Sequence, residues 1–481
     1  MILPFVGDAY AVRSPNLNAQ TCINLFPVLD GRGGKTVSAL YRTPGLTLFS
    51  DDDGLQYSVR GLYELNGVLY AVFDSGFYTV DILGVRTLKG TLNTSIGRVS
   101  IISNGLQIGI FDGVNGYTYT LSTNTFAQIT DVSFKGCVIA AYQDGYGIYP
   151  EPNSEIWWLT DLFDFSNIDA LDFAAANQSP DFTVASISSH QELWFFNDVT
   201  TEVWYDTGDA DFPFERRQTL VIQFGCAAAF SLLKTDNSSL FWLGKNEQSK
   251  GVVCRLNGYT PQVISTEAVN EAIDSYERID DAFAFAYEDK GHLFYILTFP
   301  TADRTWVYDI TTQLWHERRS QLDNDPIIGL PTRQGRWRPN CYALFNGQHI
   351  VGDFESGKLY SIDSDNYTEN GIPITWERTA YHLSNEDKWI FLNNFQIILQ
   401  GGVGLNIGQG SDPQIMVQVS RDYAHTFENE IWVPVGRQGQ FRHRALIPAL
   451  GASRDWVIRI RGTDPVFQAI LGVKAESEVT S

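Results

Sequence analysis

Histidines are the side chains best suited to metal binding or proton transfer, and in this chain none lies at a spacing that builds a site. They are His190, His292, His316, His349, His382, His425 and His443. No pair forms the HxxxH or HExxH pattern of a zinc-binding helix. The chain also lacks the GxSxG nucleophile elbow and the GxxxxGKS/T phosphate loop. We therefore expect no catalytic residue, no metal ligand, no cofactor-binding residue and no enzymatic activity.

Carboxylates are frequent enough to lie close together by chance. One group is Asp161, Asp164, Asp169 and Asp172. A glycoside hydrolase would need two of them roughly 5–9.5 Å apart across a cleft. The alternative is a loop in which the aspartates form Asx turns and face solvent. A second group, which could offer oxygen ligands to Ca²⁺, is Asp206, Asp209 and Asp211. Its spacing matches no EF-hand, and for the first group we favour the loop.

Two further motifs have the composition of functional loops. The run from Gly401 to Gly404 lacks the following helix that a phosphate loop requires, so it predicts a hairpin turn. Ser420 to Phe427 resembles the sialidase Asp box, SxDxGxTW, with Ala424 in place of the usual Gly and Phe427 in place of the usual Trp. That box is a structural turn in sialidases. The motif therefore predicts a β-hairpin and says little about glycan cleavage.

Charge and hydropathy exclude several classes of protein. The 481 residues include 56 Asp and Glu against 34 Lys and Arg, which gives a net charge of −22. Tight sequence-independent DNA binding needs clustered basic residues, so it is not expected. With 44% hydrophobic and 13% aromatic residues the chain is too apolar to be disordered. No apolar run approaches the ~18–20 residues of a membrane helix.

The five cysteines are isolated from one another. They are Cys22, Cys137, Cys226, Cys254 and Cys341, and no two form a CxxC. Metal knuckles and redox pairs are therefore not expected. Reduced, buried thiols in a protein made in the cytosol fit this usage best.

Strands are predicted nearly throughout the chain, and groups of them form a unit that repeats along the sequence. In the segment 61–80 three aromatic and β-branched runs are separated by Asn66-Gly67 and by Asp74-Ser75-Gly76. Asn-Gly is typical of a type I′ hairpin turn, in which both central residues take positive φ. Comparable units start near Gly61, Gly97, Gly136, Phe182 and Gly225, at spacings of 36 to 46 residues.

Four-stranded units at this period are typical of β-propeller blades. We count about seven units between residues 55 and 365, with the number uncertain by one. A short helix is expected at Thr266–Tyr276, where a capping residue and an early acid precede apolar positions one turn apart. It is expected to pack beside a blade.

The two ends of the chain differ from the repeats. Residues 366–481 hold the segment Trp389 to Leu399 and then four runs that alternate apolar with polar residues, and they predict a C-terminal β-sandwich. Residues 1–54 are broken by prolines and predict an N-terminal extended arm or platform segment. The sequence thus predicts an all-β protein with an arm at 1–54, a β-propeller at 55–365 and a sandwich at 366–481.

The order of several weak motifs resembles the packaged-DNA stabilisation protein of short-tailed phages, a family also called tail accessory factor, tail hub or nozzle. The motifs are Trp158-Leu159-Thr160-Asp161, Ser179-Pro180-Asp181, Val203-Trp204-Tyr205, the helix with its following strand pair at 265–316, Ile23 to Pro27 and Arg42 to Leu46.

This resemblance implies a structural virion protein of the phage tail, made in the host cytoplasm. The implied assembly is a homohexameric ring below the head–tail adaptor protein, closed by a tail needle or plug and carrying tailspikes or tail fibres. Double-stranded DNA would pass through the ring during genome ejection without sequence-specific binding. An alternative is a glycan-binding or glycan-cleaving propeller for host receptor recognition, in which Trp157, Trp158, Trp194 and Trp204 would stack on sugars.

Overall fold

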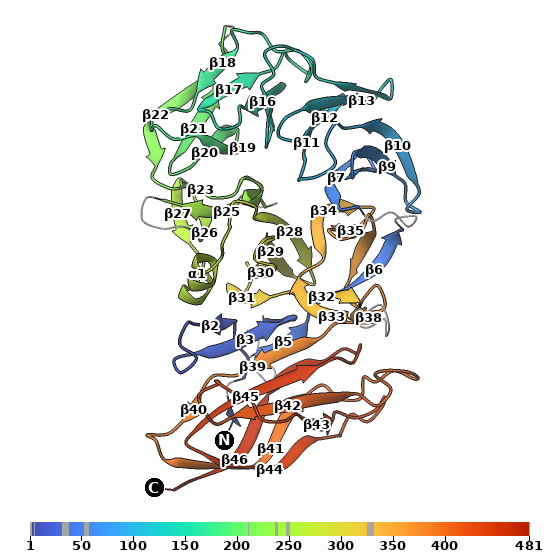
Figure 1. Ribbon diagram of the computed structural model, residues 1–481, viewed down its shortest axis with the longest axis vertical. Coiled ribbons are helices and arrows are strands. Elements are labelled where there is room, and N and C mark those ends of the chain that lie inside the picture. Colours follow the sequence, from blue (N-terminus) through green and yellow to red (C-terminus); the bar gives the residue numbers. More distant parts are fainter. Residues whose placement is uncertain are drawn as a thin grey trace.

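The computed structural model describes residues 2–3, 5–30, 38–51, 57–209, 211–235, 239–246, 251–324 and 331–480. The molecule is elongated, with the propeller at one end and the sandwich at the other (Figure 1). Strands from the beginning of the chain lie between the two parts, beside β39 (Trp376–Thr379). The repeated strand–turn pattern and the sandwich predicted from the sequence are both confirmed.

Seven sheets within the described chain form the blades, which agrees with the expected count. The first four each take four consecutive antiparallel strands. They are β7 (Val59–Leu65), β8 (Val68–Phe73), β9 (Gly76–Val80) and β10 (Arg86–Thr91); β11 (Ser100–Ser103), β12 (Gln107–Phe111), β13 (Gly116–Thr120) and β14 (Thr125–Gln128); β15 (Ala141–Gln143), β16 (Tyr146–Pro150), β17 (Ile156–Leu159) and β18 (Phe173–Ala175); β19 (Thr183–Ser189), β20 (Glu192–Asn197), β21 (Thr201–Asp206) and β22 (Phe214–Ile222).

The later blades carry the insertions. The fifth holds β23 (Gly225–Cys226), β24 (Leu233–Lys234), β25 (Leu240–Lys245), β26 (Val252–Asn257) and β27 (Thr260–Val263), with the 3₁₀ helix η1 (Ala229–Ser231). The sixth holds β28 (Phe283–Asp289), β29 (His292–Phe299), β30 (Arg304–Asp309) and β31 (Leu314–Glu317). The hairpin of β32 (Arg319–Asn324) and β33 (Pro331–Arg336) leads to the seventh.

The expected helix is present between blades five and six as α1 (Glu267–Asp274). Thr266 caps it, because its side chain accepts a hydrogen bond from the backbone N–H of Val269 at 3.4 Å. Ala268, Val269 and Ile273 are buried, so the apolar stripe of the helix packs into the core as the sequence predicted.

The seventh blade takes its outermost strand from the beginning of the chain. After β34 (Pro339–Phe345), β35 (Gln348–Asp353) and β36 (Leu359–Asp363), the fourth strand is β6 (Gly45–Ser50), in which Leu46 pairs with Ile362. Two short strands, β37 (Thr368–Glu369) and β38 (Ile372–Pro373), extend this sheet. The ring of blades is therefore closed by backbone hydrogen bonds between the two ends of the propeller. Residues 45–50 precede the boundary at residue 54, and the division into 1–54, 55–365 and 366–481 stays a prediction.

The sandwich is built from two sheets that also include early strands. One contains β1 (Ile2–Leu3), β4 (Leu25–Leu29), β5 (Ser38–Arg42), β41 (Trp389–Leu399), β44 (Ala445–Ser453) and β46 (Ala469–Thr480). The other contains β2 (Tyr10–Ala11), β3 (Ala19–Ile23), β39, β40 (Leu383–Ser384), β42 (Gln414–Ser420), β43 (Ile431–Pro434) and β45 (Asp455–Gly462). The glycine run at 401–404 lies in the connection from β41 to β42, which crosses from one sheet to the other. The expected hairpin turn there was wrong.

The strand β3 pairs with strands of both the propeller and the sandwich. Ile23 at the end of β3 pairs with Glu317 of blade six and with Glu377 of β39. The next residue, Asn24, is buried and has a φ of 54°. Its side-chain amide donates to the carbonyl oxygens of Arg319, at 2.9 Å, and Thr375, at 2.7 Å. These contacts hold the two domains together through the N-terminal segment.

Buried arginines fix the same segment to the sandwich. Arg378 is 1% exposed and donates to the carbonyl oxygens of Phe5, Asp8 and Thr21 at 2.7–3.1 Å. Arg42 donates to the carbonyl of Val466 at 2.8 Å. A guanidinium group offers five donors in a fixed plane, so one side chain can satisfy several backbone oxygens that would otherwise be buried unpaired.

Candidate functional site

An opening that combines charged and apolar side chains lies on the axis of the propeller, where the innermost strands meet. It has a volume of about 510 Å³. Its wall is built from β7, β24, β28, β29, β34 and β35 and from the residues just before β11. Along β28, Phe283, Phe285 and Tyr287 are buried in the core, and they alternate with half-buried Ala284 and Ala286. The period of two in a strand therefore leaves small side chains on one face of this inner strand.

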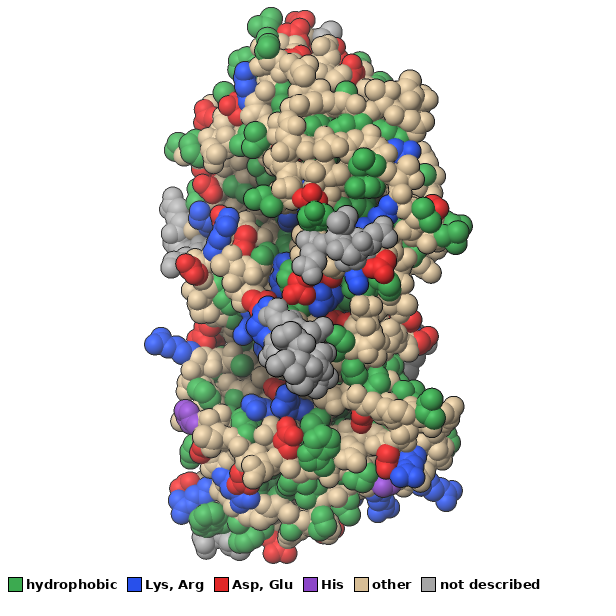
Figure 2. Space-filling view, turned by 45° about the vertical axis from the view of Figure 1, so that its right-hand side comes forward, with side chains coloured by type: hydrophobic (Ala, Val, Ile, Leu, Met, Phe, Trp, Pro, Cys, Tyr) green, Lys and Arg blue, Asp and Glu red, His purple; other side chains and the backbone are tan. Residues whose placement is uncertain are grey.

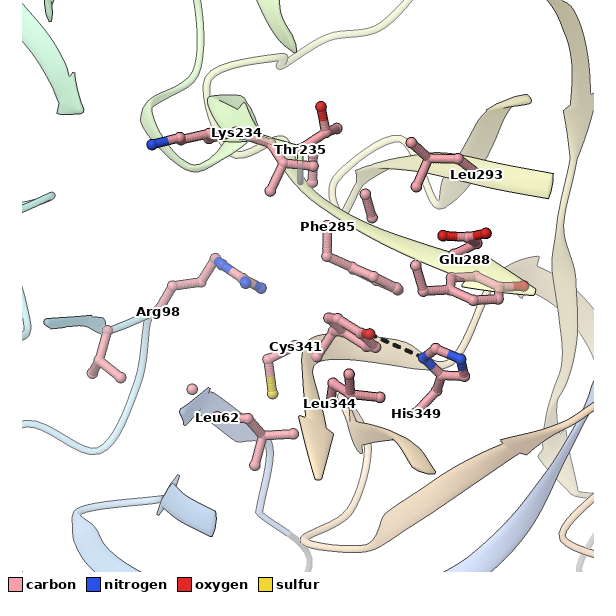
Figure 3. Close-up of a pocket in the computed structure, with 17 residues that line it drawn as sticks. Leu62, Arg98, Lys234, Thr235, Phe285, Glu288, Leu293, Cys341, Leu344 and His349 are labelled. Carbon is pink, nitrogen blue, oxygen red and sulfur yellow. Dashed lines mark hydrogen bonds between the residues drawn. The ribbon is translucent and has the colours of Figure 1, made fainter. Parts of the chain in front are cut away.

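Arg98 is a charged group at one side of this cavity (Figure 3). Its guanidinium carbon lies 4.0 Å from the ring centre of Phe283, and one Nη donates to the carbonyl oxygen of Asn340. Its Nε is buried and has no partner among the described residues. Burial lowers the pKa of Arg98 to about 10, and the neighbouring charge of Arg336 acts in the same direction. The group thus remains a cation, held by an aromatic ring instead of a carboxylate.

The other side of the cavity carries a histidine and tyrosines. The Tyr342 hydroxyl and His349 Nδ1 lie 3.0 Å apart, and the rings of Tyr287 and His349 have centres 5.4 Å apart. Desolvation lowers the pKa of His349, although Asp289 and Glu288 oppose the shift. His349 is therefore neutral near pH 7, and Arg98 supplies the positive charge of the cavity.

The aspartates of the segment 161–172 form turns. Asp164 Oδ1 accepts from the backbone N–H of Ser166 at 2.9 Å, and Asp169 Oδ1 accepts from that of Leu171 at 2.9 Å. Asp206 and Asp209 accept in the same way from residues two positions later. These are Asx turns, which the sequence favoured for the segment 161–172. Within the described ranges no three His, Cys, Asp or Glu side chains are grouped as metal ligands would be.

Three of the four tryptophans considered for sugar stacking are buried. Trp157, Trp194 and Trp204 are 0%, 2% and 7% exposed. Trp157 packs between blades three and four, with its ring centre 4.8 Å from that of Phe195 and 5.2 Å from that of Trp204. Trp158 is half-buried against Phe173. The buried rings fill the interfaces between blades and offer no face to a glycan.

The motif that resembles an Asp box forms the connection between β42 and β43, as predicted. Asp422 accepts from the hydroxyl of Thr426 at 2.6 Å and from its backbone N–H at 2.9 Å. These hydrogen bonds lower the pKa of Asp422 to about 2, and the one from Thr426 Oγ1 has the largest effect. Tyr423 and Ala424 take positive φ values of 61° and 68°, so the turn is left-handed where the motif usually has glycine.

The five cysteines are buried and unpaired, also as predicted.

His316 is a buried titratable group outside the cavity. It is 0% exposed, it packs against Phe26 and Phe294, and neither ring nitrogen has a partner in the part of the chain that the structure describes. Desolvation lowers its pKa well below 6.5, and the charges of Arg318 and His292 add to the shift. In the unfolded chain, where histidines titrate near 6.5, this residue therefore binds a proton more tightly than it does in the folded protein.

We expect the free energy of unfolding to decrease as the pH falls below about 6.5, since the unfolded state then binds more protons than the folded state. Above that pH the contribution of His316 is fully present and does not vary. The variant His316→Phe should reduce this dependence between about pH 6.5 and 5 and leave stability at pH 8 nearly unchanged. Urea unfolding at several pH values measures the effect. An unchanged slope in the variant would show that other groups cause it, among them His349, whose pKa is also lowered.

Comparison with known families gives two adjoining matches. A family model described as bacteriophage P22 Gp10, β-propeller, matches residues 1–367, and a second, described as bacteriophage P22 Gp10, β-sandwich, matches residues 375–478. The chain belongs to the bacteriophage P22 Gp10 family. This confirms the resemblance stated from the sequence, the all-β architecture and the assignment to phage structural proteins. A Gp10-like chain is a phage stabilisation and tail protein, and its family implies partners within the virion.

Solved structures with similar chain traces are more distant. The N-terminal domain of Nup159 is 10% identical, with a TM-score of 0.41 over 66% of this Gp10-family chain and 95% of that chain. The WD40 domain of Neurospora crassa Pan2 is 9% identical, with a TM-score of 0.43 over 68% and 96% of the two chains. No curated protein matches significantly.

Neither described helix is long enough to span a membrane.

Proposed function

We propose that this protein is the ring-forming tail hub, or nozzle, of a short-tailed phage. In this role six copies would sit below the head–tail adaptor protein and line the DNA exit channel. They would help to retain packaged DNA and would dock a tail needle or plug and the tailspikes or tail fibres. The proposal depends on one observation, the match of Gp10 family models to both domains in order. The protein would be made in the host cytoplasm and would act in the tail of the virion.

The charge of the chain is consistent with a channel through which DNA moves. A net charge of −22 per copy repels phosphates over roughly a Debye length, about 8–10 Å at physiological salt. On the face shown in Figure 2, acidic and basic side chains are interspersed. We attribute the repulsion to the summed field of the ring. Such a wall would let double-stranded DNA pass without sequence-specific binding.

The union of the domains supports a docking role. Propeller and sandwich share β3, and Asn24 and Arg378 fix the N-terminal segment to both with buried hydrogen bonds. Two domains that share a strand transmit contacts made at one end to the other, as a hub between adaptor and needle requires. The glycan-recognition alternative has less support, because most of its candidate tryptophans are inside the core.

Mass photometry of the purified protein mixed with the adaptor protein of the same phage tests this proposal. We expect a new species whose mass equals the adaptor ring plus six 54.0 kDa chains, and a ring in negative-stain images. Albumin in place of the adaptor protein serves as the control and should leave the mass distribution unchanged. A protein that stays monomeric and never joins adaptor rings would contradict the hub assignment.

A further inference from the structure

The axial cavity contains a cation without a described anion, and nothing in the tail-hub role accounts for it. We propose that this cavity binds a small organic anion, with a carboxylate or phosphate group on Arg98 and an apolar body against the surrounding wall. The inference is independent of the hub function, because it concerns the inside of one propeller and not a contact between subunits.

Arg98 is half-buried and has fewer described hydrogen-bond acceptors than the buried arginines Arg60 and Arg378. Arg60 is 1% exposed, and its guanidinium donates to the carbonyl oxygens of Gly97, Asp74, Thr94 and Ile96 at 2.7–2.8 Å. Arg378 has a similar set of acceptors. Arg98, in contrast, has a single described acceptor, the Asn340 carbonyl, and a buried Nε without one. Because the Nε of this half-buried cation is buried without a described acceptor, an anion that reached the guanidinium would gain charge-assisted hydrogen bonds.

The geometry of the cavity leaves room for that anion. In Figure 3 Arg98 and Lys234 lie toward one side, and Glu288 and His349 lie toward the other. Lys234 is exposed and donates to the carbonyl oxygen of Ser188 at 3.3 Å, so it adds positive potential near the rim. The carboxylate of Glu288 would repel an anion at its own end. Together these charges favour an anionic group at the Arg98 end only.

The remaining wall fits an apolar ligand body. Leu62, Phe285 and Leu344 line the cavity, and Leu344 is 52% exposed although it lies near the axis of the ring. A volume of about 510 Å³ is within the range of roughly 300–1,000 Å³ in which proteins bind small organic molecules. An inorganic ion alone would leave most of this space to water, which is why we specify an organic anion.

Isothermal titration calorimetry on the full chain tests the proposal with three probes. N-acetylphenylalanine represents the carboxyl end of a peptide, phenyl phosphate represents a phosphomonoester, and N-acetylphenylalanine amide lacks the negative charge. We expect saturable binding of at least one of the two anions and no binding of the amide. Which anion binds more tightly distinguishes the two sources of the ligand.

Two variants locate the binding, and one serves as a matched control. Arg98→Met should weaken binding roughly 10- to 100-fold, the loss expected for hydrogen bonds to a charged group. Ala286→Phe should block the cavity while Arg98 stays in place, which keeps the test valid if the first variant misfolds. Arg86→Met is the control, since Arg86 also stacks on an aromatic ring, Phe73 at 4.2 Å, but lies outside the cavity.

The proposal would be overturned if neither anion bound at millimolar concentration. It would also fail if the amide bound as tightly as the acid, or if Arg98→Met and Ala286→Phe both bound like the unmodified protein. None of these results would bear on ring formation with the adaptor protein, so the two proposals can fail separately.

Discussion

Deletion of residues 1–51 is expected to abolish cooperative folding of the whole chain. This segment contains β1 to β6 and so contributes to both sheets of the sandwich and to the seventh blade. Phe5, Leu25, Leu40 and Leu46 are each at most 2% exposed. Burying four such side chains stabilises the protein by roughly 6–12 kcal/mol. That is comparable with the whole stability of a typical domain, about 5–15 kcal/mol.

A shorter deletion separates the two contributions. Removing residues 1–44 leaves β6 available to complete the seventh blade, so the propeller should keep a thermal transition while the sandwich loses its own. Differential scanning calorimetry, followed by limited proteolysis, measures both. If the protein without residues 1–51 melted at the temperature of the full chain, the N-terminal strands would not be part of the core, and the closure described here would be wrong.

Trp157→Ala is expected to destabilise the propeller by about 3–5 kcal/mol, the range for removal of a large buried aromatic side chain. Trp157 is fully buried, and its ring lies within 6.1 Å, centre to centre, of the rings of Phe195, Trp204, Phe212 and Phe214. Alanine would leave a cavity between blades three and four that this rigid aromatic cluster cannot fill. Guanidinium unfolding, followed by fluorescence, measures the loss.

The adjacent residue provides the matched control. Trp158 is on the opposite face of β17 and is only half-buried, so Trp158→Ala should cost about 1 kcal/mol or less. A loss below about 1 kcal/mol for Trp157→Ala, or equal losses for both variants, would show that Trp157 is not packed between blades. It would then become available as a sugar-stacking residue, and the glycan-binding alternative would gain support.

Local patterns in the sequence correctly predicted the hairpins. Asn66 and Gly67 have φ values of 53° and 78°, as a type I′ turn requires, and they join β7 to β8. The helix that begins after Thr266 and the five isolated cysteines also follow from neighbouring residues alone. The strand β46 could have been found as well, since Val473 and Ala475 alternate with Lys474 and Glu476. In each case the residues that decide the conformation lie within a few positions of one another.

The candidate site was not predicted. Arg98 stands at the start of a repeat unit, where the sequence pattern gives it only the role of a residue before a strand. Its importance comes from Phe283 and Asn340, which lie in blades six and seven, and from the lack of a described carboxylate near it. Side chains that meet on the axis of a ring come from distant repeats, so no local spacing can indicate them.

The sequence by itself determined the repeat period, the turns, the all-β class and the order of motifs that marks the Gp10 family. Only the tertiary structure decided how the ring closes and how the domains join. Leu46 pairs with Ile362, and Ile23 lies between Glu317 and Glu377. A hairpin encodes its own register in its turn, whereas strands separated by some three hundred residues pair because the blades between them have already brought their edges together. The contacts of the N-terminal segment are therefore a product of the complete fold.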